Sequence, residues 1–396
     1  MLIRNGKVFD VNKGFVTADI VIDESMIMSV NEKSNAEDED INDMEGRNKV
    51  TCNEPDGACI DATGLYVIPG LVDIHFHGCM GYDFSDGTLE ALEKMAEYEA
   101  SNGITAMCPA SMTYDETRLA RVFSTAVKYR DSYDCYKAQA ELVGINMEGP
   151  FISEDKRGAQ NKEYICNPDV DMFDRLKKAA DGMIRVVDIA PEMDGAMEFI
   201  ESVASSVRVS LAHTNADYDT TMRAFDKGAD HVTHLYNAMP PFHHRNPGVV
   251  GAAADRENVY VELIGDGVHC SPATVRATFK MFGEDRIVLI SDSMEACGMP
   301  DGEYELGGQK VIVKGSATLE DGTIAGSVAN LMDCVRVLVK SMNIPLAAAI
   351  KCASFNPAKS IGISDRYGSL EPGRIANIVL LNENLDIVRV ILRGQL

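Results

Sequence analysis

The chain has 396 residues, of which 45% are apolar and 25% charged, a composition typical of a folded globular protein rather than a disordered one. Its 37 basic and 61 acidic residues give a formal net charge of −24, which disfavours partners that are themselves anionic, such as nucleic acid and acidic membrane surfaces. The N-terminus lacks the apolar core of a signal peptide, and no stretch approaches the roughly 18 apolar residues that a membrane span needs. We therefore expect a cytoplasmic protein whose ten scattered cysteines are reduced thiols.

The two ends of the chain carry short runs of β-type residues. Near the N-terminus these runs are Met1–Val8, Ala18–Ile27 and Cys59–Asp61, and near the C-terminus they are Ile375–Leu381 and Asp386–Arg393. They predict one small β-sandwich domain built from residues 1–66 and 361–396 together. Between the first runs lies the segment Asn31–Gly46, which has seven acidic residues and a single lysine. We interpret this segment as a solvated loop rather than a binding tail.

The middle of the chain alternates apolar, β-rich runs with segments of helical character. Eight parallel strands, each followed by a helix, predict an α/β fold of the (β/α)8 TIM-barrel type over residues 67–360. An open, doubly wound sheet is the alternative, but neither GxGxxG nor GxxxxGK[ST] occurs to support nucleotide binding. The expected strands are Val67–Ile74, Ile104–Pro109, Leu142–Met147, Ile184–Ala190, Val207–Ala212, His231–Leu235, Val259–Ile264 and Ile287–Ser291, and the clearest helices between them are Leu89–Ala100, Glu116–Tyr129, Asp169–Ala180, Tyr218–Lys227 and Pro272–Phe282.

Residues that can bind metal lie where these expected strands end. Alternate residues of a strand point to one face, so the spacing of His75 and His77 places both imidazoles together. The carboxyl ends of barrel strands converge at the catalytic face, so the other strand-end residues are expected beside them. Imidazoles with a carboxylate suit zinc or another first-row divalent ion, which activates water at neutral pH. The further strand-end residues are Glu148, His213, His234, His269 and Asp292, whereas His231 is expected to be structural.

Several longer strings around these residues resemble the N-acetylglucosamine-6-phosphate deacetylase family of the amidohydrolase superfamily. The resemblance runs over nearly the whole chain, and the order of the strings matches. They are PGLVDIHFHG from Pro69, MEGPFI from Met147, KRGAQ from Lys156, HTNA from His213, HLYNAM from His234, DGVH from Asp266, SDS from Ser291 and IAGS from Ile324.

The resemblance implies a metal-dependent hydrolase that removes the acetyl group from N-acetylglucosamine 6-phosphate. Glu148, His213 and His234 would hold the principal ion, and His75 with His77 could hold a second one. Zinc is the first expectation for the ion, with iron, manganese and cobalt as alternatives, and Asp292 would act as general base and acid. Part of the phosphate site would come from the neighbouring subunit of a homodimer. The implied substrate contacts are Ala159, Gln160, Asn237, Ala238, Arg245, His269, Ile324, Ala325 and Gly326.

Two of the implied substrate contacts have their own physical argument. The Arg245 guanidinium can match a phosphate with two parallel hydrogen bonds. Some family members carry a histidine where this chain has Gln160, whose amide can donate a hydrogen bond to the acetyl carbonyl but cannot carry charge.

Three other functions compete with this interpretation. The same chemistry on N-acetylgalactosamine 6-phosphate differs only at one hydroxyl. A dihydroorotase or hydantoinase is disfavoured because those enzymes commonly use a carboxylated lysine where this chain has Glu148. A catalytically silent sugar-phosphate-binding protein would be expected to lack a ligand or the general base, and neither is missing here.

Overall fold

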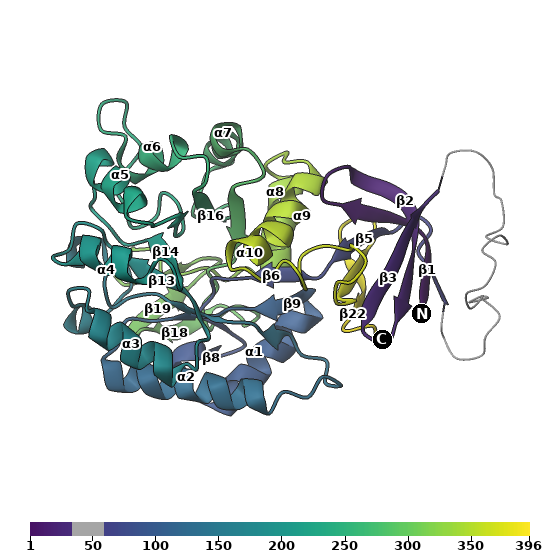
Figure 1. Cartoon of the computed structure of the whole chain (residues 1–396), viewed down its shortest axis with the longest axis horizontal. Helices are drawn as coiled ribbons and strands as arrows, with labels where there is room; N and C mark the ends of the chain where they lie inside the picture. Colours follow the sequence, from purple (N-terminus) through teal and green to yellow (C-terminus); the bar gives the residue numbers. More distant parts are fainter. Residues whose placement is uncertain (34–58) are drawn as a thin grey trace.

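The two ends of the chain meet in one mixed sheet of seven strands (Figure 1). The computed structural model describes residues 1–33 and 59–396, so residues 34–46 of the predicted acidic loop lie outside the described part. The strand order is β22-β21-β5-β1-β2-β3, and β4 pairs with β1. The bounds are β1 Leu2–Asp10, β2 Gly14–Asp23, β3 Met26–Glu32, β4 Cys59–Asp61, β5 Tyr66–Pro69, β21 Ile378–Leu381 and β22 Ile387–Ile391. The predicted union of both ends is confirmed, whereas the sandwich arrangement and the two-domain division stay predictions.

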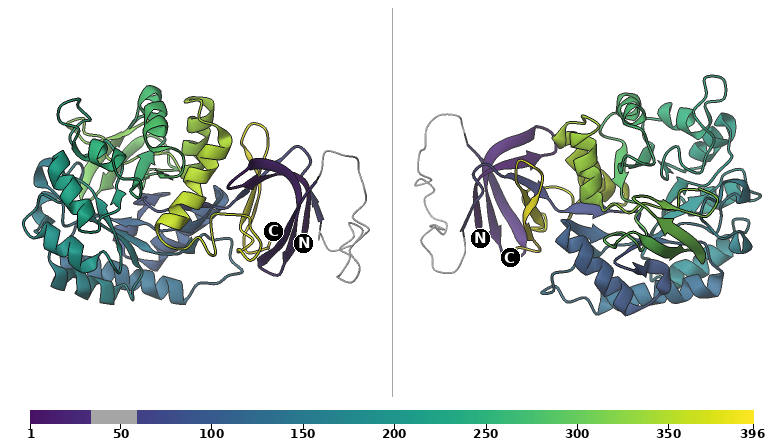
Figure 2. Two further views of the ribbon diagram at one scale, coloured as in Figure 1. Left: turned by 45° about the horizontal axis from the view of Figure 1, so that its top comes forward. Right: turned by 180° about the vertical axis from the view of Figure 1, so that it is seen from behind.

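The terminal sheet has its own core and is tied to the rest of the chain by Arg393. Apolar side chains of both ends, among them Ile3, Ile20 and Ile378, form one buried cluster. The Arg393 side chain, with the residue 7% exposed, donates hydrogen bonds of 2.8 Å to the carbonyl oxygens of Cys135 and Lys137. In all views this sheet lies at one end of the molecule, beside the helix-rich body (Figure 2).

The predicted run Val67–Ile74 is not one strand. It divides at Gly70 into β5, which belongs to the terminal sheet, and β6 (Leu71–Asp73), which pairs with β9 (Ile104–Met107). Glycine is required here because a Cβ at this position would lie 2.1 Å from the Thr105 Oγ1 atom. The chain therefore passes between the two sheets at Gly70 rather than at residue 67.

The middle of the chain forms a curled sheet of parallel strands, surrounded by helices in Figures 1 and 2. Seven strands are paired in the order β10-β12-β13-β14-β15-β16-β17. Three further strands are paired in the order β6-β9-β11. The strands β10 and β12 follow β9 and β11 after short breaks, so both members of each pair occupy one strand position. The bounds are β10 Ala110–Ser111, β11 Glu141–Leu142, β12 Ile145–Met147, β13 Ile184–Ile189, β14 Arg208–Leu211, β15 His231–Val232, β16 Tyr260–Ile264 and β17 Ile287–Ile290.

Several helices follow a residue whose side chain accepts a hydrogen bond from a free backbone N–H group. Thr88, Asp115, Asp169, Asp217 and Ser271 cap the five predicted helices in this way, which fixes where each begins. The bounds are α1 Leu89–Ser101, α2 Glu116–Asp131, α3 Val170–Ala179, α4 Ala196–Val203, α5 Tyr218–Asp226, α6 Gly248–Ala254, α7 Pro272–Phe282, α8 Leu331–Lys340, α9 Leu346–Ala353 and α10 Phe355–Ser360, with 3-10 turns at Phe84–Asp86, Glu154–Lys156 and Lys162–Tyr164.

A small antiparallel sheet follows the last parallel strand and was not predicted. It consists of β18 (Gly302–Leu306), β19 (Gln309–Val313) and β20 (Ala317–Thr318), and it leads into the segment that carries Ile324 to Gly326. A two-stranded ribbon, β7 (Gly78–Cys79) with β8 (Tyr82–Asp83), follows the first parallel strand.

Two further expectations concern the cysteines and the membrane. Of the nine cysteines in the described part of the chain, eight carry free thiols and Cys59 takes part in a disulfide bond, so the prediction of reduced thiols is wrong for Cys59. Among the helices of the described residues, none combines the length and the apolar character that crossing a membrane requires.

Candidate active site and metal centre

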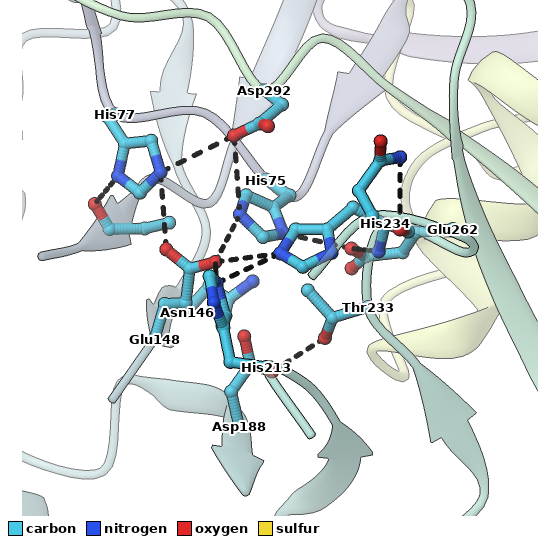
Figure 3. A network of polar contacts seen from close by, with 12 residues as sticks. His75, His77, Asn146, Glu148, Asp188, His213, Thr233, His234, Glu262 and Asp292 are labelled. Atoms are coloured by element: carbon cyan, nitrogen blue, oxygen red, sulfur yellow. Dashed lines mark hydrogen bonds and ion pairs between the residues drawn. The ribbon is translucent and has the colours of Figure 1, made fainter. Parts of the chain in front are cut away.

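The predicted metal-binding residues converge at the carboxyl ends of the parallel strands (Figure 3). His75 and His77 follow β6, and Glu148 follows β12 directly. His213 and His234 follow β14 and β15, and all five of these residues are at most 6% exposed. The structure therefore brings together side chains that are separated by up to 159 residues in the sequence, from position 75 to position 234.

Glu148 stands at the centre of the cluster, and its two carboxylate oxygens together lie near all four histidines. Its Oε1 atom lies 3.0 Å from the Nε2 atom of His213 and 3.2 Å from that of His234. The same oxygen lies 3.4 Å from His75 Nε2, and Oε2 lies 3.2 Å from His77 Nε2. Glu148 can thus belong to two ligand sets at once.

Both sets have the donor chemistry of a site for a divalent ion. His75, His77 and Glu148 form one set, and Glu148, His213 and His234 form the other, with ligand atoms within 4.8 Å of one another. The His75 Nε2 atom is buried without a hydrogen-bond partner among the described residues, which is the condition of an imidazole that faces a cation. Two imidazoles and a carboxylate are the ligands that zinc and its first-row neighbours prefer, so the residues fit the ion that the sequence predicts.

The backbone at three site residues adopts the left-handed region that side chains other than glycine rarely occupy. The φ angles are 43° at His213, 29° at His234 and 48° at Asp292. Such conformations persist only where surrounding contacts hold them, and they concentrate at functional sites. The strand ends are thus shaped to aim these side chains into the site.

Asp292 lies at the end of β17 beside both histidines of the first set. Its Oδ1 atom is 3.4 Å from His77 Nε2 and 3.7 Å from His75 Nε2. Burial alone would raise the pKa of Asp292, but the hydrogen bond from His77 and the charges of the nearby histidines outweigh burial and lower it. Asp292 is therefore held as a carboxylate that can accept a proton.

The same interactions act on the other members of the cluster. Burial alone would raise the pKa of Glu148. The charge of His75 and the hydrogen bonds from the histidines outweigh burial and hold this pKa well below its ordinary value. For His77, the hydrogen bonds with Asp292 and Glu148 outweigh burial and raise the pKa to about 10. Without an ion, the site therefore keeps its charges balanced by protonated imidazole, which an incoming cation must displace.

A cavity of 480 Å³ opens directly above this cluster. The volume is within the range of small-molecule sites. Of the residues for which a substrate role is predicted, seven line the cavity, namely Ala159, Gln160, Asn237, Ala238, His269, Ile324 and Gly326.

Arg245 and Ala325 are not brought to the cavity wall. Arg245 is exposed in the turn closed by a bridge between His243 and Asn246, and this turn faces solvent. Ala325 is fully buried, and its backbone N–H donates a 3.1 Å hydrogen bond to the carbonyl oxygen of Ala317. The phosphate role predicted for Arg245 stays a prediction, and within one chain the cations lining the cavity are instead Lys156 and Arg157.

Gln160 and Glu262 make contacts that the sequence did not reveal. The Gln160 Nε2 atom donates a 2.7 Å hydrogen bond to Glu148 Oε2, and its Oε1 atom accepts one of 2.7 Å from the Thr113 N–H. Glu262 was missed altogether, although it is fully buried and lies 2.9 Å from His75 Nδ1. The available signal was a carboxylate within the apolar run Val259–Ile264.

Comparison with known proteins places this chain in a family. The model of the amidohydrolase family matches residues 66–396. The chain is 37% identical over 332 residues to the N-acetylglucosamine-6-phosphate deacetylase of Bacillus subtilis, covering 83% of this chain and 84% of that protein. It is 34% identical over 330 residues to the N-acetylgalactosamine-6-phosphate deacetylase of Escherichia coli O157:H7, covering 83% and 86% of the two chains.

A solved structure agrees with these relatives over the full length of the chain. The N-acetyl-D-glucosamine-6-phosphate deacetylase of Mycobacterium smegmatis, a mutant in complex with N-acetyl-D-glucosamine-6-phosphate, superposes with a TM-score of 0.88 at 31% identity. The match covers 100% of this chain and 98% of that one. The chain therefore belongs to the amidohydrolase family.

Proposed function

We propose that this protein hydrolyses the acetamide of N-acetylglucosamine 6-phosphate and releases acetate and glucosamine 6-phosphate. The observation that carries the proposal is the cluster of four histidines and two carboxylates at the floor of a cavity of 480 Å³. Relatives and a solved structure named for this reaction match the chain over most of its length. The residue cluster and the names of these relatives both support the proposed deacetylation.

We assign the two ligand sets to divalent metal, with Glu148, His213 and His234 as the principal set and His75, His77 and the shared Glu148 as the second. A bound divalent ion supplies Lewis-acid chemistry, since it lowers the pKa of water toward neutrality and polarises a carbonyl oxygen. We propose zinc as the ion, because the donors are nitrogen and carboxylate oxygen. Iron, manganese and cobalt accept the same donors, and either one or two ions per subunit fit these sets.

Asp292 performs the proton transfers in this proposal. As water adds to the acetyl carbon, the Asp292 carboxylate accepts one of its protons, and it then passes that proton to the amine nitrogen as the C–N bond breaks. The second proton of the water also ends on the amine as the acid product ionises, so the products are acetate and the protonated amine, and atoms and charge balance without another reactant. The Gln160 amide, which lines the cavity beside Glu148, donates a hydrogen bond to the acetyl oxygen and helps to orient it.

The substrate's sugar and phosphate contact the remaining cavity residues. We assign this role to Ala159, Asn237, Ala238, His269 and the segment from Ile324 to Gly326, as the sequence predicts. Arg245 is exposed and lies outside the cavity of its own chain. We therefore propose that it contacts the phosphate of a substrate bound in the neighbouring subunit. The homodimer and the cytoplasmic location are parts of this proposal.

We also propose that the curled sheet is a closed (β/α)8 barrel and that the terminal sheet belongs to a small sandwich domain. The backbone N–H of Asp292, after β17, donates a 2.9 Å hydrogen bond to the carbonyl oxygen of His75, after β6. This bond joins the first strand to the last, which supports closure.

N-acetylgalactosamine 6-phosphate is the second candidate substrate. A relative with 34% identity is named for that epimer, which differs only in the orientation of one hydroxyl. The same metal ligands and the same Asp292 would serve both reactions.

The deciding experiment measures acetate release from three sugars in parallel with purified, zinc-loaded protein. The sugars are N-acetylglucosamine 6-phosphate, its galacto epimer and unphosphorylated N-acetylglucosamine. Turnover of the first alone supports the proposal, preference for the epimer selects the second candidate, and no acetate from any sugar contradicts the deacetylase function.

A further inference from the structure

We propose that Glu262 is a positioning residue that holds one histidine from each of the two metal-ligand sets in its working orientation. This inference deepens the proposed function and rests on its assignment of His75 and His234 as ligands. Glu262 itself touches neither the cavity nor the central carboxylate, so it acts through the two histidines.

The contact with His75 fixes which ring nitrogen faces the site. Glu262 Oε2 lies 2.9 Å from His75 Nδ1, and the same oxygen accepts a 3.1 Å hydrogen bond from the backbone N–H of His234. An oxygen that already accepts from a backbone N–H is placed as an acceptor, so the His75 Nδ1 atom carries the proton and donates it. The Nε2 atom of His75 is then the ring nitrogen that faces the ligand set, and it points toward Glu148 and Asp292 (Figure 3).

The contact with His234 supports its backbone. His234 has a φ angle of 29°, which is strained for a residue with a side chain. Glu262 holds this turn twice, because its side chain accepts from the His234 N–H and its backbone carbonyl accepts a 2.9 Å hydrogen bond from the Leu235 N–H. The strained conformation aims the His234 Nε2 atom at Glu148 Oε1, which is 3.2 Å away.

The remaining oxygen of Glu262 shows that packing alone does not explain this residue. Glu262 is fully buried, and its Oε1 atom has no hydrogen-bond partner among the described residues. The His231 Nδ1 atom lies 3.8 Å from this oxygen, but burial keeps that ring neutral. A buried carboxylate oxygen without a hydrogen bond destabilises a fold, and an apolar side chain in β16 would avoid that cost. Carboxylates that accept from the second ring nitrogen of a ligand histidine orient the ring and raise its basicity. This is the arrangement that Glu262 makes with His75.

The experiment compares Glu262→Leu, Glu262→Gln and a control variant, Asp188→Asn. The Asp188 carboxylate is also fully buried beneath the site, but it accepts a 2.9 Å hydrogen bond from the Thr233 hydroxyl rather than from a histidine. The first measurement is the zinc affinity of each metal-free protein, by competition with a chelating dye. The second is the long-range nitrogen–proton NMR spectrum of metal-free protein labelled in its histidine rings, with the His75 signals identified by their loss in His75→Asn.

We expect Glu262→Leu to bind zinc roughly 10-fold to 100-fold more weakly and to lose the Nδ1-protonated state of His75. Glu262→Gln keeps an acceptor oxygen but not the charge, so its affinity should fall between those of Glu262→Leu and the wild type. Asp188→Asn should keep the His75 spectrum of the wild type.

A folded Glu262→Leu variant with wild-type zinc affinity and an unchanged His75 spectrum overturns the proposal. Should that variant not fold, equal zinc affinity of Glu262→Gln and the wild type overturns it as well. Both measurements use metal-free protein, so they remain readable even if the wild type releases no acetate, which would contradict the proposed function instead.

Discussion

His231 provides a test of how burial and pH determine stability in this molecule. Its ring is fully buried on β15, with the Nδ1 atom 3.1 Å from the Ser210 hydroxyl oxygen. Burial lowers the pKa of His231 from 6.5 to about 4, although Glu262 opposes the shift. In the unfolded chain the ring takes up a proton near pH 6.5, whereas in the folded chain it stays neutral until about pH 4.

The sign and the size of the effect follow from this difference. Between these two values the unfolded state binds more protons, so His231 makes the free energy of unfolding fall as the pH falls. At 1.36 kcal/mol for each pH unit, the loss relative to neutral pH is about 1.4 kcal/mol at about pH 5.5 and about 2.5 kcal/mol at about pH 4.5. Above about pH 6.5 both states are neutral and the contribution is constant.

The variant His231→Asn removes the titrating ring and keeps a polar atom near Ser210. The assay is urea unfolding of metal-free wild type and variant, followed by circular dichroism, from neutral pH to about pH 4.5. The cavity left by the smaller side chain lowers stability equally at every pH, so only the slope carries the information. The variant should lose about 2.5 kcal/mol less than the wild type over this range.

A control separates His231 from histidines in general. His244 is exposed to water in the folded chain as in the unfolded one, so His244→Asn should keep the wild-type slope. Equal slopes for His231→Asn and the wild type would refute the argument that burial keeps this ring neutral.

Four further predictions concern the site and the junction between the sheets. Asp292→Asn should lower kcat by about 10²-fold to 10⁴-fold while zinc stays bound, and a near-normal kcat would remove Asp292 from the proton transfers. Gln160→Ala should lower kcat with little change in zinc content, whereas loss of the metal would make Gln160 a support for Glu148 instead. A chelator should abolish acetate release, and added zinc should restore it. Zinc that binds again at neutral pH should release protons, because the pKa of His77 is about 10 before the ion arrives. Calorimetry in buffers of different ionisation enthalpy measures this release, and finding none would contradict the prediction. Gly70→Ala should destabilise the protein by about 1–3 kcal/mol through the clash with Thr105, and thermal unfolding should show partial recovery when Thr105→Gly is added.

Local patterns in the sequence were sufficient to predict much of this structure. The i, i+2 spacing of His75 and His77 and the polar residues after apolar runs predicted a cluster that the structure assembles from four further strand ends. These predictions succeed because strand periodicity and the shared edge of parallel strands are local rules.

Other features depend on contacts that no local pattern encodes. The run Val67–Ile74 divides at Gly70 because Thr105 on a neighbouring strand leaves no room for a side chain there. In the sequence, Glu262 is an isolated carboxylate within an apolar strand. Its role depends on His75, which only the fold brings next to it. Arg245, which a motif places near phosphate, lies on an exposed turn, so its contribution depends on a second subunit that one sequence does not position.

The order of strands in the terminal sheet has a consequence for synthesis of the chain. Strand β21 lies between β22 and β5, so one edge of β5 is uncovered until residues 378–391 have left the ribosome. The parallel sheet, by contrast, is complete once β17 has emerged at residue 290. An uncovered strand edge is a template for pairing with other chains, so the nascent protein carries an aggregation risk from the emergence of β5 until β21 has been added, even after the parallel sheet is complete. A chain terminated shortly before β21 would therefore have its ligand residues already made and its terminal sheet still open.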